Sequence, residues 1–182
     1  MIFTRIYKRI QLILKIKKFA KHGSNIYFSP WNSQFTYQNI ELGNHISIGE
    51  YADFIATRSK IIVGDHVVFA PKVSMRGGDH RVDMVGRFID TVEDYEKLPE
   101  NDLDIIIEGD NWIGMNVTIL KGVTIGRGTI VGAGSVVTKN LPSYSICAGV
   151  PCRFIKKRFT DAEIMEHEKI LYGKITEKQD NV

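Results

Sequence analysis

The sequence has 182 residues, of which 43% are hydrophobic and 25% charged, the composition of a soluble globular protein with one domain of ordinary size. Residues 1–21 carry seven Lys or Arg and no acid, so the rest of the chain has a net charge of −4 within a total of +3, which argues against nucleic-acid binding by that part. Two cysteines, Cys147 and Cys152, are too few for a disulfide scaffold, and no run of 18 uncharged apolar residues exists, so a reducing cytoplasm and no membrane-spanning helix are expected.

The first predicted element is a basic amphipathic helix over residues 1–23. Its apolar side chains recur three or four residues apart, with basic residues between them. These apolar residues are Phe3, Ile6, Ile10, Ile13 and Ile16. Two interpretations stay open. The helix packs on its own protein or on a sister subunit, or it attaches peripherally to an anionic membrane surface through its basic side chains.

A six-residue repeat runs through residues 24–150, the predicted main domain. It is clearest over residues 111–139, NWIGMNVTILKGVTIGRGTIVGAGSVVTK, where an aliphatic residue occupies every sixth position. A small or β-branched residue follows four places after each aliphatic residue. Earlier in the chain the repeat slips by three residues between Phe54 and Val63, and this slip is expected to alter the wall that faces an acceptor.

This period excludes a long helix, because Gly follows many of the aliphatic residues and each interior Gly would cost a helix about 1 kcal/mol. Very short strands joined by tight turns fit it. The aliphatic side chain points into a narrow prism, and the next position often needs the conformational freedom of Gly. Each coil pairs its backbone with the coils above and below, so stability comes from stacking. The sequence therefore predicts an all-β fold, a parallel β-helix of hexapeptide repeats.

Two further segments interrupt or follow the coil. Residues 76–104 lose the repeat and are predicted to form a long extruded loop, a kind of segment that is commonly functional. Residues 151–182 form a C-terminal segment. Within it Thr160 and Glu163 make a capping box, so a helix of about a dozen residues is expected to follow.

The stretch WIGMNVTILKGVTIGRGTIVGAGSVVTKN followed by AGVPCRFIKKRF closely resembles the hexapeptide-repeat acetyltransferases. Residues 42–159 are similar to the branch that holds the xenobiotic acetyltransferases and the sugar O-acetyltransferases of bacterial surface-polysaccharide synthesis. The resemblance implies a left-handed coil and a homotrimer with active sites between its subunits. It also implies acetyl-CoA as co-substrate, with no metal.

Of the five histidines, His80 has the context of a catalytic base. It lies outside the repeat register at the exit of the loop, where Gly77 and Gly78 let the backbone turn sharply. An imidazole can take a proton from a hydroxyl as that oxygen attacks an acyl carbon. In the family that the sequence resembles, the catalytic histidine lies in this loop. Asp79 and Asp83 flank it and are candidates to orient the ring or to contact the acceptor.

Coenzyme A carries a pyrophosphate and a ribose phosphate, so cations and free backbone N–H groups should line its groove. The resemblance places coenzyme-binding cations at Lys139 and Arg153. Lys156 extends the positive rim, although a solvated basic run explains it equally well.

The resemblance implies four more contacts with the donor. Ala133 and Thr138 correspond to coil positions that meet the pantetheine or the phosphates. Trp112 corresponds to an aromatic residue near the thioester, although an apolar contact at a subunit interface is an equal alternative. The backbone N–H of Met115 corresponds to the donor for the oxyanion.

Together these observations predict an acetyl-CoA-dependent O-acetyltransferase that modifies a saccharide in capsule, O-antigen or exopolysaccharide biosynthesis. Alternatives within the family are a streptogramin-type drug acceptor and an amine of a nucleotide sugar. An alternative of another class is a β-helix that binds without catalysis. Zinc chemistry of the γ-type carbonic anhydrases needs three converging imidazoles, and His80 has no partner at the required coil positions.

Overall fold

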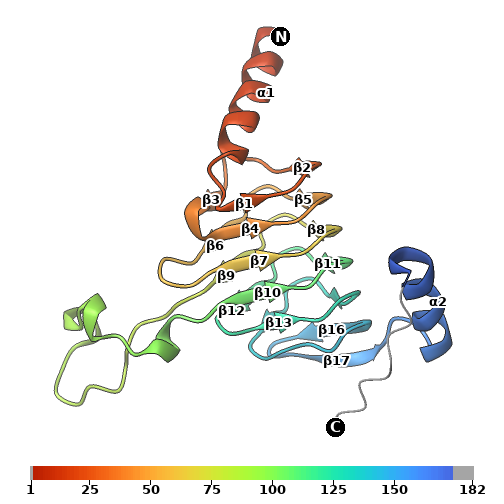
Figure 1. Cartoon of the computed structure of the whole chain (residues 1–182). Coiled ribbons are helices and arrows are strands. Elements are labelled where there is room, and N and C mark those ends of the chain that lie inside the picture. Colours follow the sequence, from red (N-terminus) through yellow and green to blue (C-terminus); the bar gives the residue numbers. More distant parts are fainter. Residues whose placement is uncertain (1, 174–182) are drawn as a thin grey trace.

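The computed structural model describes residues 2–173, without the side chains of residues 2–6, 8 and 9. Within this range the chain winds into a three-sided coil, and each side is a sheet of very short strands (Figure 1). Sheet A contains β1 (Lys21–His22), β4 (Ile40–Leu42), β7 (Ile61–Val63), β10 (Ile105–Ile107) and β13 (Thr124–Ile125). Sheet C contains β3 (Gln34–Phe35), β6 (Asp53–Ile55), β9 (Ser74–Arg76), β12 (Thr118–Leu120) and β15 (Val136–Val137).

Sheet B has two strands more than either of the others. It contains β2 (Ile26–Tyr27), β5 (Ile46–Ile48), β8 (Val67–Phe69), β11 (Asn111–Ile113), β14 (Ile130–Val131), β16 (Ser145–Gly149) and β17 (Cys152–Lys157). Among the described strands, neighbours pair in parallel except β16 and β17, which form an antiparallel hairpin. The chain visits the sheets in the order A, B, C, so every coil has an A–B corner, a B–C corner and a C–A corner.

The inside of the coil is filled by the residues that the repeat predicts. The aliphatic residue of each hexad is at most 1% exposed, at Ile113, Ile119, Ile125, Val131 and Val137. The small or β-branched residue four places later is 0% exposed, at Val117, Val123, Thr129 and Ser135. The predicted parallel β-helix is confirmed. Each side chain in the prism is surrounded by the coils above and below it, so burial depends on stacking.

A helix and the loop lie outside the prism. Helix α1 (Ile2–Ile16) stands on the first coil and points away from it (Figure 1). Leu12 and Ile16 pack against the core, and the chain then enters β1. The helix is shorter than the predicted range 1–23, because Phe19 turns inward and is buried in the first coil.

The extruded loop leaves sheet C after β9 and returns to sheet A at β10, so it emerges at a C–A corner (Figure 1). It contains the short 3-10 helices η2 (Ile89–Thr91), η3 (Asp94–Glu96) and η4 (Pro99–Asn101). Gly77 sits where the loop begins, and a Cβ there would lie 2.3 Å from Ser59 Oγ. The two limbs of the loop are hydrogen-bonded to each other, from Leu103 N to Gly77 O at 2.9 Å. A side chain at position 77 would therefore push the first limb of the loop away from the coil.

The chain ends with a hairpin and helix α2 (Asp161–Tyr172). The predicted capping box is confirmed, since Thr160 Oγ1 accepts from Glu163 N and the Glu163 carboxylate accepts from Thr160 N. The hydroxyl of Tyr144 donates to buried Glu168 at 2.8 Å. Burial, together with this carboxylate, raises the pKa of Tyr144 above its usual range. Residues 174–182 of the predicted C-terminal segment lie outside the described residues, and β17 is an extra strand that the repeat did not predict.

Ile107 and Ile106 are adjacent in β10, but only Ile107 is fully buried in the prism. Replacing Ile107 by Ala should lower the free energy of unfolding by about 2–5 kcal/mol, because the coils cannot close over the cavity. Ile106→Ala, the matched change on the outer face, should cost about 1 kcal/mol or less. Denaturant unfolding at one protein concentration measures both values. Equal losses for the two variants would contradict the inward assignment.

Candidate active site

His80 lies on the outgoing limb of the loop, three residues after Gly77. It lines a cavity of about 160 Å³ at the C–A corner. The cavity is lined by Ile55, Thr57, Arg76, Gly78, Asp79, His80, Lys97 and Asp102. The imidazole is exposed, and no group in residues 2–173 hydrogen-bonds it. Its ring nitrogens are therefore available to a bound molecule.

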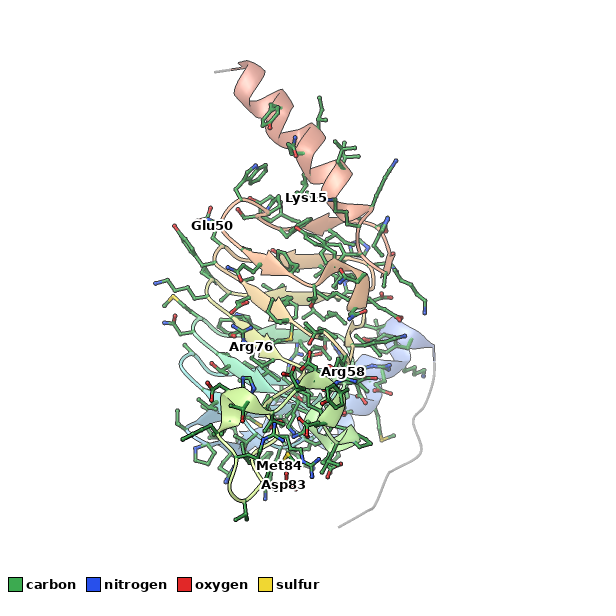
Figure 2. All side chains as sticks on the ribbon, turned by 90° about the vertical axis from the view of Figure 1, so that its left-hand side faces the viewer. Lys15, Glu50, Arg58, Arg76, Asp83 and Met84 are labelled. Atoms are coloured by element: carbon green, nitrogen blue, oxygen red, sulfur yellow. The ribbon has the colours of Figure 1, made fainter. Side chains whose placement is uncertain are left out.

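The predicted slip of the repeat forms one wall of this cavity. Ile55 ends β6 and Thr57 lies in the long turn between β6 and β7, at the same corner as the loop one coil earlier. Arg76 lies on the coil above the loop, whereas Asp83 and Met84 lie at the far end of the loop in Figure 2. The wall that bears His80 thus combines the coil with both limbs of the loop.

The two carboxylates that flank His80 have other partners. Asp79 Oδ2 lies 2.8 Å from Lys121 Nζ, and Asp79 Oδ1 accepts from Asn101 at 3.0 Å. Partial burial acts to raise the pKa of Asp79, but these two hydrogen bonds outweigh it and hold the pKa below its usual value. Asp83 accepts from Arg81 at 2.7 Å, and this contact lowers the pKa of Asp83. Asp79 ties the loop to the next coil, and Asp83 braces the loop itself.

A second group of predicted residues lies on sheet B and at the B–C corner. Trp112 points outward from β11 with 55% of its surface exposed. Met115 and Ala133 occupy equivalent corner positions in successive coils, where Gly134 N donates to Met115 O at 2.8 Å. In the described part of the chain the N–H of Met115 has no acceptor. This corner offers an apolar surface beside an unused backbone donor.

The hairpin adds cations to the same sheet. Lys156 pairs with Ile146 on β16, in the row of sheet B that also contains Trp112. Arg153 pairs with Ala148, and its guanidinium hydrogen-bonds only the carbonyl of Cys152 among the described residues. Both cations are exposed. They form a positive edge on the last strand of the sheet, which suits a phosphate-bearing ligand.

Thr138 and Lys139 lie on the other side of the molecule. They follow β15 at the C–A corner, and Lys139 is one coil beyond Lys121. They therefore share a corner with the loop and with His80, and sheet C separates them from Met115 and Ala133. The predicted site residues form two groups in one protomer, because strands of sheet C span the distance between the corners.

Several residues beside His80 were not predicted from the sequence. They are Arg76, Lys97, Asp102 and Lys121. One signal was present: an extruded loop must begin and end at the same corner, so residues at its two ends meet. Asp102 lies at the returning end, and its backbone forms an antiparallel bridge with Gly78.

His45 and His66 lie at a different corner of the coil. His45 and His66 stack at the A–B corner with ring centroids 4.5 Å apart. Among residues 2–173, no three or more His, Cys, Asp or Glu side chains are grouped so that they could hold a metal ion.

Comparison with known proteins agrees with the fold. The family described as "Bacterial transferase hexapeptide (six repeats)" matches residues 104–139. Galactoside O-acetyltransferase of Escherichia coli (strain K12) is 33% identical over 179 residues, which are 94% of this chain and 76% of that protein. A probable macrolide acetyltransferase of Lysinibacillus sphaericus is 37% identical over 129 residues, which are 65% of this chain and 70% of that protein.

A solved structure extends the match to the co-substrate. A hexapeptide-repeat-containing acetyltransferase from Vibrio cholerae, complexed with acetyl-CoA, has a TM-score of 0.70 and 26% identity, covering 84% of this chain and 78% of its own. The predicted left-handed coil and the use of acetyl-CoA are thereby confirmed. By this relatedness and its repeat, the chain belongs to the hexapeptide-repeat acetyltransferases, which take the acetyl group from acetyl-CoA.

Proposed function

We propose that this acetyltransferase acetylates a hydroxyl of a saccharide in capsule, O-antigen or exopolysaccharide biosynthesis, with His80 as general base. The observation that carries the proposal is the unpaired, exposed imidazole in a cavity lined by charged side chains. Such a lining suits a sugar better than a large apolar drug. The galactoside O-acetyltransferase relative supports the same acceptor class, whereas the macrolide acetyltransferase relative keeps a drug acceptor as the alternative.

The acetyl group passes directly from donor to acceptor, with no acetyl-enzyme between them. His80 takes the proton of the acceptor hydroxyl as its oxygen forms a bond to the acetyl carbonyl carbon. The carbonyl oxygen becomes negative and accepts a hydrogen bond from Met115 N–H. The carbon–sulfur bond then breaks, and the coenzyme thiolate recovers the proton from His80. Cys147 and Cys152 take no part, since both are buried.

A homotrimer completes the site in this proposal. His80 lies at the C–A corner and the Trp112, Met115 and Arg153 group lies on sheet B and the B–C corner. Two corners of one prism cannot meet, but a three-fold axis brings the C–A corner of one protomer against sheet B of the next. Exposed apolar side chains on both surfaces, Trp112 on the sheet and Phe88 on the loop, support such a contact.

Replacing His80 by Asn should lower kcat by about 10²–10⁴-fold, because the base is lost while the shape is nearly kept. Thiol release from acetyl-CoA with a panel of methyl glycosides measures the rate. Binding of acetyl-CoA, followed by calorimetry, should stay unchanged. His66→Asn is the matched control, since His66 is an exposed corner residue outside the cavity. If the His80→Asn enzyme keeps the wild-type rate, His80 is not the general base.

Mixing two inactive variants tests whether sites lie between protomers. If His80 and Arg153 from neighbouring subunits share each site, random trimers of His80→Asn and Arg153→Ala regain activity in about a quarter of their sites. Each variant alone remains nearly inactive. Activity is measured after co-refolding the two variants, with separately refolded samples as control. No gain on mixing would mean that one protomer holds the whole site.

Helix α1 supports a peripheral contact of this cytoplasmic enzyme with the inner membrane face. Exposed apolar side chains on it include Tyr7, Ile10, Ile13 and Leu14, each at least half exposed. Among the described side chains of the helix, Leu12 and Ile16 pack against the core, and basic residues recur along the segment. A basic helix with an uncovered apolar face is the pattern of attachment to anionic lipid. No described helix is long and apolar enough to cross a membrane, and both cysteines are free, as a reducing compartment requires.

Co-sedimentation with vesicles tests this contact. Wild type should bind vesicles that contain phosphatidylglycerol but should not bind vesicles of pure phosphatidylcholine. Added salt should reduce the binding. Ile10→Gln with Leu14→Gln should abolish binding. The control Ile170→Gln makes the same change at an exposed position of α2. Equal binding of wild type and the double variant would argue for a protein partner on α1.

A further inference from the structure

The cavity beside His80 contains a buried hydrogen-bond acceptor that the protein leaves unused. The side chain of Asp102 is 8% exposed, and within residues 2–173 its Oδ1 has no hydrogen-bond partner. Its Oδ2 lies 3.6 Å from Lys97 Nζ, beyond hydrogen-bond distance. Burying a carboxylate oxygen without a donor is unfavourable, so such an atom in a cavity wall indicates a donor from outside the protein.

The backbone holds this oxygen close to His80. Gly78 and Asp102 form an antiparallel bridge between the two limbs of the loop. A Cβ on Gly78 would lie 2.1 Å from Asp102 Oδ1, so the carboxylate lies directly against the Gly78 backbone. Gly78 precedes His80 by two residues, and all three residues line the same cavity. A molecule bound at His80 therefore occupies the cavity that the Asp102 side chain also lines.

The other charged groups of the cavity already have partners. Arg76 is paired with Asp53 and Asp79 with Lys121. The Lys97 ammonium lies between Asp102 and Asp94, 3.6 Å from each carboxylate. Because these cations are compensated, the cavity has no strong attraction for an anion. The position left open is an acceptor, and it suits a neutral O–H donor.

We propose that Asp102 Oδ1 binds a second hydroxyl of the acceptor, next to the hydroxyl that His80 deprotonates. This inference rests on the proposed function and narrows its substrate class to polyols with a free hydroxyl beside the one that is acetylated. Two contacts on adjacent hydroxyls orient the ring and select which oxygen attacks. The cavity is smaller than the ~300–1,000 Å³ usual for ligand sites. It therefore takes one edge of a sugar, and the remainder of a longer glycan stays outside.

The test compares methyl galacto-, gluco- and mannopyranosides with their monodeoxy analogues in the thiol-release assay, and NMR of the products identifies the acetylated hydroxyl. For wild type, removing the neighbouring hydroxyl should lower kcat/KM by about 10–100-fold, the usual effect of losing a hydrogen bond to a charged group. Asp102→Asn should show a similar fall with the parent sugar and little further loss with the deoxy sugar. The KM for acetyl-CoA and the unfolding midpoint should stay the same.

Asp90→Asn, on an exposed part of the same loop, is the matched control and should behave as wild type. If Asp102→Asn does not fold, Asp102→Ser removes the carboxylate with a smaller side chain and is held to the same expectations. Wild-type discrimination between parent and deoxy sugars that persists in the variant overturns the inference alone. Failure of wild type to acetylate any of these saccharides overturns the proposed function, and the inference with it.

Discussion

The structure depends on the stacking of three-residue strands around one column of buried side chains. Each coil bonds its backbone to the coils on either side, and its aliphatic residue fills the prism completely, as at Ile113 and Ile119. Such a column tolerates no extra residue inside. Inserted residues must therefore project from a corner, so that the strands before and after the insertion keep their backbone hydrogen bonds with neighbouring coils.

The loop shows this rule at work. Strands β9 and β12 pair in register, as do β7 and β10, although the loop separates them in sequence. The insertion therefore leaves the ladder intact, and its own limbs must be tied to one another. Gly77 and Gly78 allow that close approach, and Lys121 of the next coil binds Asp79. The rigid coil thus carries His80 on a loop whose two ends are held in place. This arrangement favours accurate positioning of a general base.

A prism with distinct corners also separates the two groups of candidate residues in space. His80 and Asp102 line the cavity at the C–A corner, whereas Trp112, Met115 and the cations of β17 lie on sheet B and at the B–C corner. Under the proposed function, neither surface works alone, and assembly joins them. Acceptor choice can then change through the loop while the donor surface of the coil remains as it is.

The sequence by itself determined the coil, because a buried aliphatic residue at every sixth position allows only short stacked strands, and it located the loop and the capped helix α2. Local chemistry was also readable: His80 is out of register, and the cations Arg153 and Lys156 follow the repeat. Only the tertiary structure decided which of these residues meet. In the structure α1 ends at Ile16, and Asp79 forms an ion pair with Lys121. Asp102, from the returning end of the loop, lines the same cavity as His80. Periodicity reports which side of the backbone is buried, but contacts between the limbs of an irregular loop depend on packing that no period encodes.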